Sequence, residues 1–429
     1  MKTNRPVPLA LAAFGAALWI AGCASGRYNE DVNRYERRRI ALEQRLAADP
    51  RDVAALRDLG VIHVRTARYA RGYDLLKQAF AADAQDPEML FYLGIASETV
   101  GDRSSAVRVY EKYETLPRLS PYRRLMVGRL GALVRDDARR QALELVAAED
   151  TLRAGAPTSS RVVAVFPLQY RGDDARFAPI ARGLSEMITV DLANVGSLRV
   201  VERVRMSALL DELRLSASSR VDPATAPRVG RLIGAGRVVG GAYSVVDGRT
   251  LRVDLSAWAY GEAPAPTLTS ADDALAKFFQ IEKALVFDLL TSMGVEPTPA
   301  ERARIERIPT QNLQAFLAYS RALEREDAGD FRGAAGLFNQ ALRLDPAFGA
   351  AAGRAEATDG MATAGSTPES ALAAAPEANG LAGNGLLDRR IGTLLSDLNA
   401  GLLPGIDNRK PAQEAPVFFP PPPPRPNPD

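Results

Sequence analysis

Cysteine and histidine are almost absent from this sequence, which contains one of each in 429 residues. A disulfide framework needs at least two cysteines, and Cys/His zinc sites need several such ligands. The sole histidine, His63, has no second histidine nearby with which to hold a metal ion. We therefore expect no metal and no cofactor, and we find no catalytic constellation.

An excess of positive charge is also lacking, since 54 lysines and arginines face 52 aspartates and glutamates, for a net charge of +2. Proteins that bind nucleic acids usually carry a strongly basic face. The charges here are interspersed, which is typical of solvated helix faces. Nucleic acid is therefore not an expected partner, whereas the apolar content of 46% suffices for two or three globular domains.

The amino terminus combines a short basic region with an apolar run. Lys2 and Arg5 precede the stretch 7–21, which is too short to span a bilayer comfortably and is typical of a signal peptide. The residues directly before Cys23 are Ile20, Ala21 and Gly22. This run resembles the lipobox of bacterial lipoproteins, which implies removal of residues 1–22 and lipidation of Cys23. An ordinary signal peptide with an incidental cysteine is the alternative.

A lipidated Cys23 implies a membrane location for the mature chain. The diacyl and amino-terminal acyl groups of such lipoproteins exceed the two hydrophobic signals that stable anchoring needs. Residue 24 is alanine, and in Gram-negative lipoproteins a residue other than aspartate at this position favours sorting to the outer membrane. We expect a chain anchored in the outer membrane by this covalent lipid, with its body in the periplasm.

A 34-residue period marks residues 23–150. The pairs Leu59-Gly60 and Leu93-Gly94 are 34 residues apart, and Gly128 follows after another 34. At the same offset Gly72 corresponds to Ala106. This pattern resembles tetratricopeptide repeats, in which small residues lie where two helices cross closely. The three units are expected to open at Val53, Pro87 and Pro121.

Residues 160–293 are expected to form a small α/β domain. Apolar runs, helical periodicity and turn residues define its elements. In chain order these are a strand at 162–168, helices at 177–192 and 206–215 around a strand at 198–201, a helix from Asp222 to Gly234, strands at 237–246 and 249–258, and a helix at 275–293. Asp247-Gly248 between the last two strands is a strong signal for a two-residue hairpin.

Four short segments of this domain resemble the CsgG-like family of outer-membrane lipoproteins. They are Leu198–Arg203, Leu209–Leu213, Val221–Ala224 and Leu232–Ala235, in the family's order. Related folds occur in the amino-terminal domain of TolB and in lipoproteins that activate cell-wall synthases. Curli-type channels of the family insert long amphipathic hairpins into the membrane. Helices rather than such strands are expected here between the second strand and the hairpin, so we expect no pore formation by this chain alone.

Two sequence features resemble ligand sites, one a glycine-rich phosphate-binding loop and the other a pair of metal-binding carboxylates, but their positions in the sequence do not favour either function. Gly234-Ala-Gly236 follows a helix and opens a strand, the reverse of a dinucleotide-binding loop, so a helix cap is expected. Asp173-Asp174 and Asp272-Asp273 are expected in turns and helix caps rather than in a metal site.

The last third of the chain predicts one more repeat and a tail. Residues 311–352 match a single tetratricopeptide-like unit whose signature positions are Ala334, Ala341 and Pro346. A lone unit must pack on the α/β domain, on the amino-terminal repeats or on a partner. Residues 353–429 are expected to form a flexible tail, with disorder at 353–384, a short helix at 386–398 and a polyproline run at 416–428 that serves as a spacer or as a ligand for aromatic grooves.

The sequence therefore predicts an α+β multidomain protein, in which tetratricopeptide-type helical repeats flank a small three-layer-like α/β domain with a mixed sheet. Repeat arrays present surfaces for proteins and peptides. The function expected first is a non-catalytic scaffold in envelope assembly or secretion. The alternatives are a lipoprotein activator that docks on a cell-wall enzyme and an oligomeric secretion channel component. The expected partners are periplasmic or outer-membrane proteins, and self-association into a homo-oligomer stays open.

Overall fold

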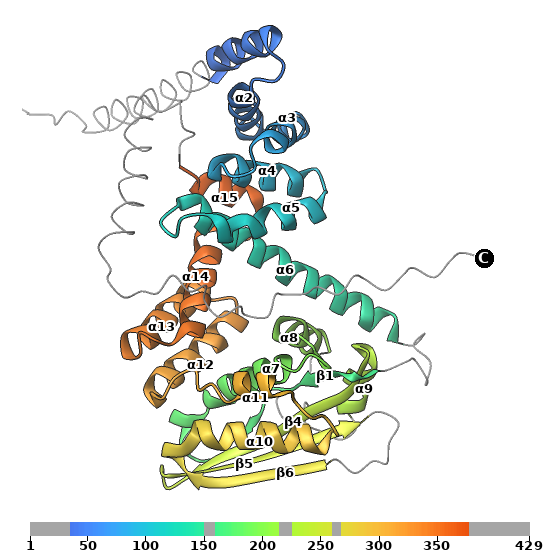
Figure 1. Cartoon of the computed structure of the whole chain (residues 1–429), viewed down its shortest axis with the longest axis vertical. Coiled ribbons are helices and arrows are strands. Elements are labelled where there is room, and N and C mark those ends of the chain that lie inside the picture. Colours follow the sequence, from blue (N-terminus) through green and yellow to red (C-terminus); the bar gives the residue numbers. More distant parts are fainter. Residues whose placement is uncertain (1–34, 150–158, 214–224, 260–266, 377–429) are drawn as a thin grey trace, which may run out of the picture. The chain divides into compact units, whose positions relative to one another are not determined.

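The computed structural model describes residues 35–149, 159–213, 225–259 and 267–376. The chain divides into two compact units, of which the first comprises Met1–Leu130 and Ala364–Pro404 and the second Gly131–Thr363 and Gly405–Asp429. In the described residues the first unit is helical, and the second contains a sheet with helices (Figure 1).

The first unit consists of stacked helix pairs. In chain order its helices are α2 (Val53–Arg65), α3 (Tyr69–Ala82), α4 (Pro87–Thr99), α5 (Arg103–Tyr110), the short 3₁₀ helix η1 (Glu111–Thr115), the beginning of α6 (Pro121–Ala147) and α15 (Pro368–Ala374). Residues 35–48 are helical as well. Helices α2, α4 and α6 begin at the three residues that the 34-residue period predicts, so this prediction is confirmed. Asp52 and Asp86 cap α2 and α4 by accepting hydrogen bonds from backbone amides three residues on.

The second unit is built on a six-stranded mixed sheet with the order β3-β1-β4-β5-β6, in which β2 also pairs with β4. The strands are β1 (Ser159–Val165), β2 (Gln169–Tyr170), β3 (Arg199–Val200), β4 (Ala235–Val246), β5 (Thr250–Ala259) and β6 (Thr267–Ala274). Strands β1, β3 and β4 are parallel, whereas β4, β5 and β6 are antiparallel. Asp247 and Gly248 join β4 to β5 with φ values of +52° and +64°, which confirms the predicted tight hairpin.

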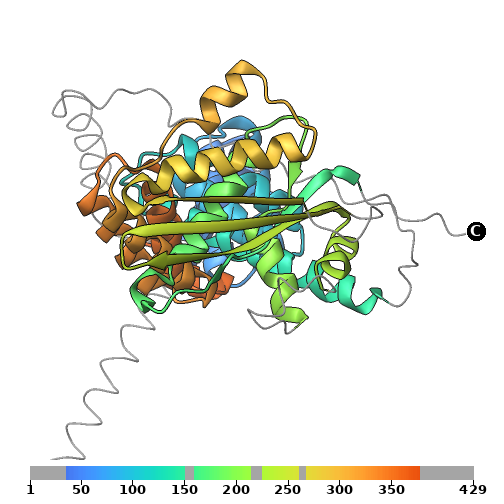
Figure 2. The ribbon, with the colours of Figure 1, turned by 90° about the horizontal axis from the view of Figure 1, so that it is seen from below.

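Helices cover both faces of this sheet, which makes three layers. Successive β1 residues alternate between two cores, because neighbouring side chains on a strand point to opposite faces. Val163 and Val165 join α7 (Ile180–Ala193) and α10 (Phe278–Ser292), whereas Ala164 and Phe166 join α8 (Arg203–Glu212) and α9 (Thr225–Leu232). Figure 2 shows α10 lying along the long strands. The predicted fold class is thus confirmed.

Four further helices follow the sheet in this unit: α11 (Pro299–Ile305), α12 (Leu313–Asp327), α13 (Phe331–Leu344) and α14 (Gly349–Ala364). Helices α12 and α13 form the predicted single repeat pair. Of the three expected packing partners, the α/β domain is the one observed, since α12 packs on α7 and shares its core. Gly183 of α7 permits this approach, because an added Cβ would lie 2.6 Å from the Phe316 ring.

Three expectations are wrong. Residues 353–374 are not disordered but lie in α14 and α15, where Ala355, Met361 and Ala371 are buried. Strand β6 was not expected, because it lacks apolar alternation and forms by pairing with β5. Asp272 and Asp273 therefore lie on an edge strand rather than in a turn. The expected helix at 386–398 and the polyproline run lie outside the described residues.

Candidate functional site

The repeat signature residues other than Pro346 lie within the helix pairs of the two units. Leu59, Leu93, Ala106, Ala334 and Ala341 are buried. Pro346 is exposed in the turn after α13. An added Cβ at Gly60 would lie 2.6 Å from Leu76 Cγ, and one at Gly94 would collide with the Tyr110 ring. Glycine is needed at these two positions because the second helix of each pair crosses the first directly over them.

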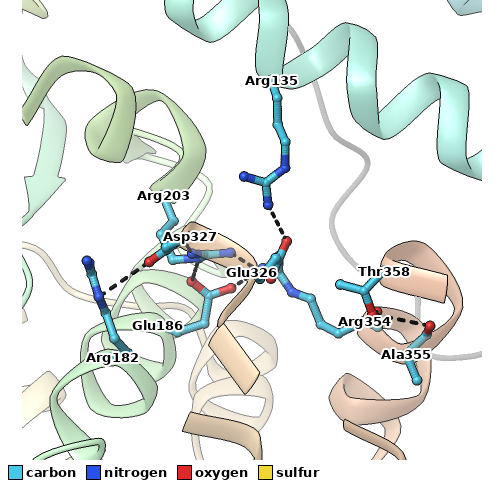
Figure 3. Close-up of polar contacts among 9 residues, drawn as sticks. All are labelled: Arg135, Arg182, Glu186, Arg203, Glu326, Asp327, Arg354, Ala355 and Thr358. Atoms are coloured by element: carbon cyan, nitrogen blue, oxygen red, sulfur yellow. Dashed lines mark hydrogen bonds and ion pairs between the residues drawn. The ribbon is translucent and has the colours of Figure 1, made fainter. Parts of the chain in front are cut away.

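A buried cluster of charged side chains lies in the second unit, where α12 and α14 pack on the α/β domain (Figure 3). Its members come from five helices and are Arg135, Arg182, Glu186, Arg203, Glu326, Asp327 and Arg354. We call this set the seven-residue cluster.

Glu326 is the centre of the seven-residue cluster. Its Oε1 accepts a hydrogen bond from Arg135 Nη2 at 2.8 Å, and its Oε2 accepts one from Arg203 Nη2 at 3.0 Å. Arg354 Nη1 lies 3.3 Å from Glu326 Oε1, and its Nη2 donates to Glu186. Arg203 Nε lies 3.2 Å from Glu186 Oε2. Each carboxylate therefore binds guanidinium groups from at least two helices.

The electrostatics of Glu326 depend on these arginines. The residue is 3% exposed and lies in the last turn of α12, where the helix dipole disfavours negative charge. Burial by itself raises the pKa of Glu326, but the charges of three neighbouring arginines, Arg354 first, outweigh burial and lower the pKa to about 2. Asp327 next to it pairs with Arg182 at 3.3 Å and with Arg203. The Glu326 carboxyl group is thus held as an anion by fixed cations.

The seven-residue cluster borders a small hollow at the carboxyl end of β1. The lining includes Val165, Pro167, Arg182 and Arg203, and the hollow has a volume of about 20 Å³. Strand β1 has β3 on one side and β4 on the other. This is the switch point at which open α/β sheets usually bind ligands. A volume that admits about one water is far below the roughly 300 Å³ of small-molecule pockets. The geometry therefore suits docking of the α12 carboxylates rather than a substrate.

A second buried charged group holds α10 against α7. Lys283 Nζ lies 2.5 Å from Asp191 Oδ2 and 3.2 Å from Glu282 Oε2. Burial, and then the negative charge of Asp191, raise the pKa of Glu282 well above its ordinary value. One lysine side chain therefore faces two buried carboxyl groups, and burial also raises the pKa of Asp191. Like the seven-residue cluster, this group is internal and positions helices.

Some of the expected site residues lie outside the residues that the structure describes, and other expectations can be compared only within the described residues. The lipidation site Cys23 and the lipobox residues Ile20, Ala21 and Gly22 lie outside them. Within 35–149, 159–213, 225–259 and 267–376, no three histidine, cysteine, aspartate or glutamate side chains are grouped as a metal ion would require. In the same part of the chain, no helix combines the length and apolar character needed to cross a membrane.

Comparison with known proteins identifies the α/β domain. Residues 144–248 match the family model of the curli production assembly/transport component CsgG. The α/β domain is therefore similar to the CsgG family over these residues. The match runs from the last turn of α6 to the β4–β5 turn, so β5, β6 and α10 lie outside it. It covers about a quarter of the chain, and the predicted resemblance to this family is confirmed.

Two solved structures are similar to this chain. The LpoB C-terminal domain from Salmonella enterica is 21% identical and covers 30% of this chain and 93% of its own, with a TM-score of 0.22. A tetratricopeptide repeat protein from Parabacteroides merdae is 11% identical and covers 75% of this chain and 90% of its own, with a TM-score of 0.21. Both scores are below 0.5, so neither likeness supports a conclusion about function. No curated protein matches the chain.

The sequence singled out only one member of the seven-residue cluster. Arg203 ends the segment Leu198–Arg203 that resembles the CsgG-like family. Its partner Glu326 is 123 residues away, and Glu186 is 168 residues from Arg354. No local pattern connects such positions, because ordinary solvated helix faces also contain arginine and glutamate at similar spacings.

Proposed function

We propose that this protein is a lipoprotein of the outer membrane that acts in the periplasm as a non-catalytic, protein-binding scaffold in envelope assembly or secretion. The observation that carries the proposal is the α/β domain that matches the CsgG family model and its attachment to a repeat-type helix pair through the seven-residue cluster. A scaffold must hold its binding surfaces in a fixed geometry, and buried ion pairs allow only one arrangement of the helices that they join.

Four features support this proposal over a catalytic role or a channel. The helix pairs of the first unit belong to a class that presents surfaces to peptides and proteins. The hollow at the switch point has room for about one water molecule. The β4–β5 hairpin pairs within the sheet from Arg237–Ala259 to Val246–Thr250, which favours a scaffold over a channel component. The seven-residue cluster itself is saturated with ion pairs and offers no free nucleophile.

Crosslinking in intact cells tests the proposal. The full chain, Cys23→Ala and the matched control Ser25→Ala are each expressed with a tag, fractionated, crosslinked and analysed by mass spectrometry. We expect the chain and Ser25→Ala in the outer membrane, crosslinked to envelope proteins, and Cys23→Ala released from the membrane because its acyl chains are missing. Retention of the mature-sized Cys23→Ala protein in the outer membrane would contradict the lipid anchor.

The same experiment separates the alternative roles. Specific enrichment of a peptidoglycan synthase would favour an activator. Crosslinks only between copies of the chain, together with dye release from liposomes by the purified protein, would favour a channel component. Crosslinks to neither envelope proteins nor other copies would overturn the scaffold.

A further inference from the structure

One face of the first unit is covered by a distant segment of the same chain. Residues 365–376 lie on the face that the first helices of the repeat pairs form, and α15 within this segment packs on α4 (Figure 1). At one end, Arg129 Nη1 of α6 donates to the Gly365 carbonyl at 3.2 Å. At the other end, Arg65 of α2 donates to the Pro376 carbonyl. We call the surface around Arg65, Tyr92 and Arg129 the clamp face.

Local features of the segment define where α15 begins and keep this helix short. Gly365 has a φ of +69°, and Thr367 and Ser370 form a capping box that begins α15. Helix α15 has seven residues, fewer than the roughly 12 that an isolated helix needs to be stable in water. Its helical form therefore depends on the clamp face. A segment so short has few contacts to lose when another peptide competes.

The contacts indicate which features of a peptide the clamp face recognises. Both arginines bind main-chain carbonyls, which every peptide has, so they select the length of the segment rather than its sequence. Ala371 has no exposed surface, whereas Ala373 and Ala374 are exposed. A side chain larger than alanine at position 371 would collide with the surface below it. The clamp face thus requires a small residue in the centre of its occupant.

Arg65 of the clamp face also contacts an aromatic ring beside the segment. The Arg65 guanidinium stacks over the Tyr92 ring at 5.3 Å. Arg65 therefore contacts both the Tyr92 ring and the carbonyl at the end of the segment.

We propose that the clamp face is a peptide-docking surface that the chain keeps closed with its own residues 365–376. The partner is a short helical segment of an envelope protein that has alanine or serine at its centre and displaces these residues. The proposal rests on the scaffold function and adds the surface, the partner chemistry and an internal competitor. Because the competitor is tethered, its effective concentration is high, and only a matching partner opens the surface.

A peptide-binding experiment on the full chain tests this proposal. The probe is a fluorescent peptide with the sequence of residues 364–376, and binding is measured by anisotropy to the wild type, Ala371→Glu and the matched control Ala373→Glu. Ala371→Glu removes the internal segment from the clamp face. We expect it to bind the peptide at least tenfold more tightly than the wild type, with Ala373→Glu like the wild type. A peptide that itself carries Ala371→Glu should not bind.

Equal affinity of the three proteins, or equal binding of the substituted peptide, would overturn the proposal. A second measurement needs no variant. Hydrogen–deuterium exchange of residues 368–374 in the wild type should rise when unlabelled peptide is added in excess, because the segment is displaced. Unchanged exchange at saturating peptide would equally refute displacement. Both results are independent of the Cys23→Ala experiment. That experiment could contradict the lipid anchor while the added peptide still displaces residues 365–376.

Discussion

Substitution of Glu326 by glutamine is the sharpest test of the seven-residue cluster. The change keeps the shape of the side chain and removes one negative charge. In the wild type four arginines face three carboxylates, and in Glu326→Gln the same four arginines face two. Arg135 is affected most, because Glu326 is the carboxylate to which it pairs.

Two independent routes give the magnitude. Removal of one partner from a buried ion pair costs about 3–5 kcal/mol. The folded pKa of Glu326 is about 2, against an ordinary value of 4.5. This difference corresponds to about 3 kcal/mol in favour of the folded state at neutral pH, since each pKa unit is worth about 1.36 kcal/mol. We therefore expect Glu326→Gln to reduce the free energy of unfolding of the second unit by about 3 kcal/mol.

Tryptophan fluorescence measures this change. The chain has two tryptophans, and in a protein expressed from residue 24 onward Trp258 of β5 is the sole one, so its emission reports on the second unit. With a urea m-value of about 1–3 kcal/mol per molar, the midpoint should fall by about 1 M or more. The control Glu306→Gln removes an exposed carboxylate that lies 3.9 Å from Arg302 and should leave the midpoint nearly unchanged. Equal midpoints for the two variants would refute the reasoning.

Three further outcomes follow from the same structure. As the pH falls from 4.5 through 2, the difference in urea midpoint between the wild type and Glu326→Gln should shrink steadily, because a lowered carboxyl pKa stabilises fully only above this window and the stabilisation is lost within it. A constant difference would contradict the ion pairing. Gly94→Leu should destabilise the first unit by about 2 kcal/mol or more, because the new side chain collides with the Tyr110 ring. Thermal unfolding followed by circular dichroism measures this change. The control Gly336→Leu, at a glycine with open space around it, should not lower stability in this way. Lys283→Met should cost about 3 kcal/mol by the Trp258 urea assay, because it leaves two buried carboxyl groups without their cation; an unchanged midpoint would show that this group does not hold α10.

The repeats could be predicted to the residue because their causes are local. A close helix crossing needs glycine at positions such as Gly60 and Gly94, and each helix start needs a cap such as Asp52 or Asp86. These requirements recur in each unit, so the period appears in the sequence itself. The Asp247-Gly248 turn is local in the same sense, since the type of turn dictates its residues.

The features that could not be predicted have causes far away in the chain. The edge strand β6 is polar, and its extended form comes from pairing with β5. Helix α14 has the alanine and glycine content of a disordered tail, but these small residues let it pack closely, as where Met361 Sδ lies against Gly131. The seven-residue cluster joins residues more than 120 positions apart. Composition and periodicity carry no signal for such pairings.

The position of the seven-residue cluster bears on how α12 and α14 are attached to the α/β domain. In an open α/β sheet, the crevice beyond the parallel strands at the switch point is the usual ligand site. Here Arg182 and Arg203 lie at that point, and the carboxylates of Glu326 and Asp327 from the following helix pair are their anions. Replacing such buried charges by apolar residues would often be neutral or stabilising, so stability alone does not account for them. These ion pairs join α12 and α14 to α7 and α8 of the domain.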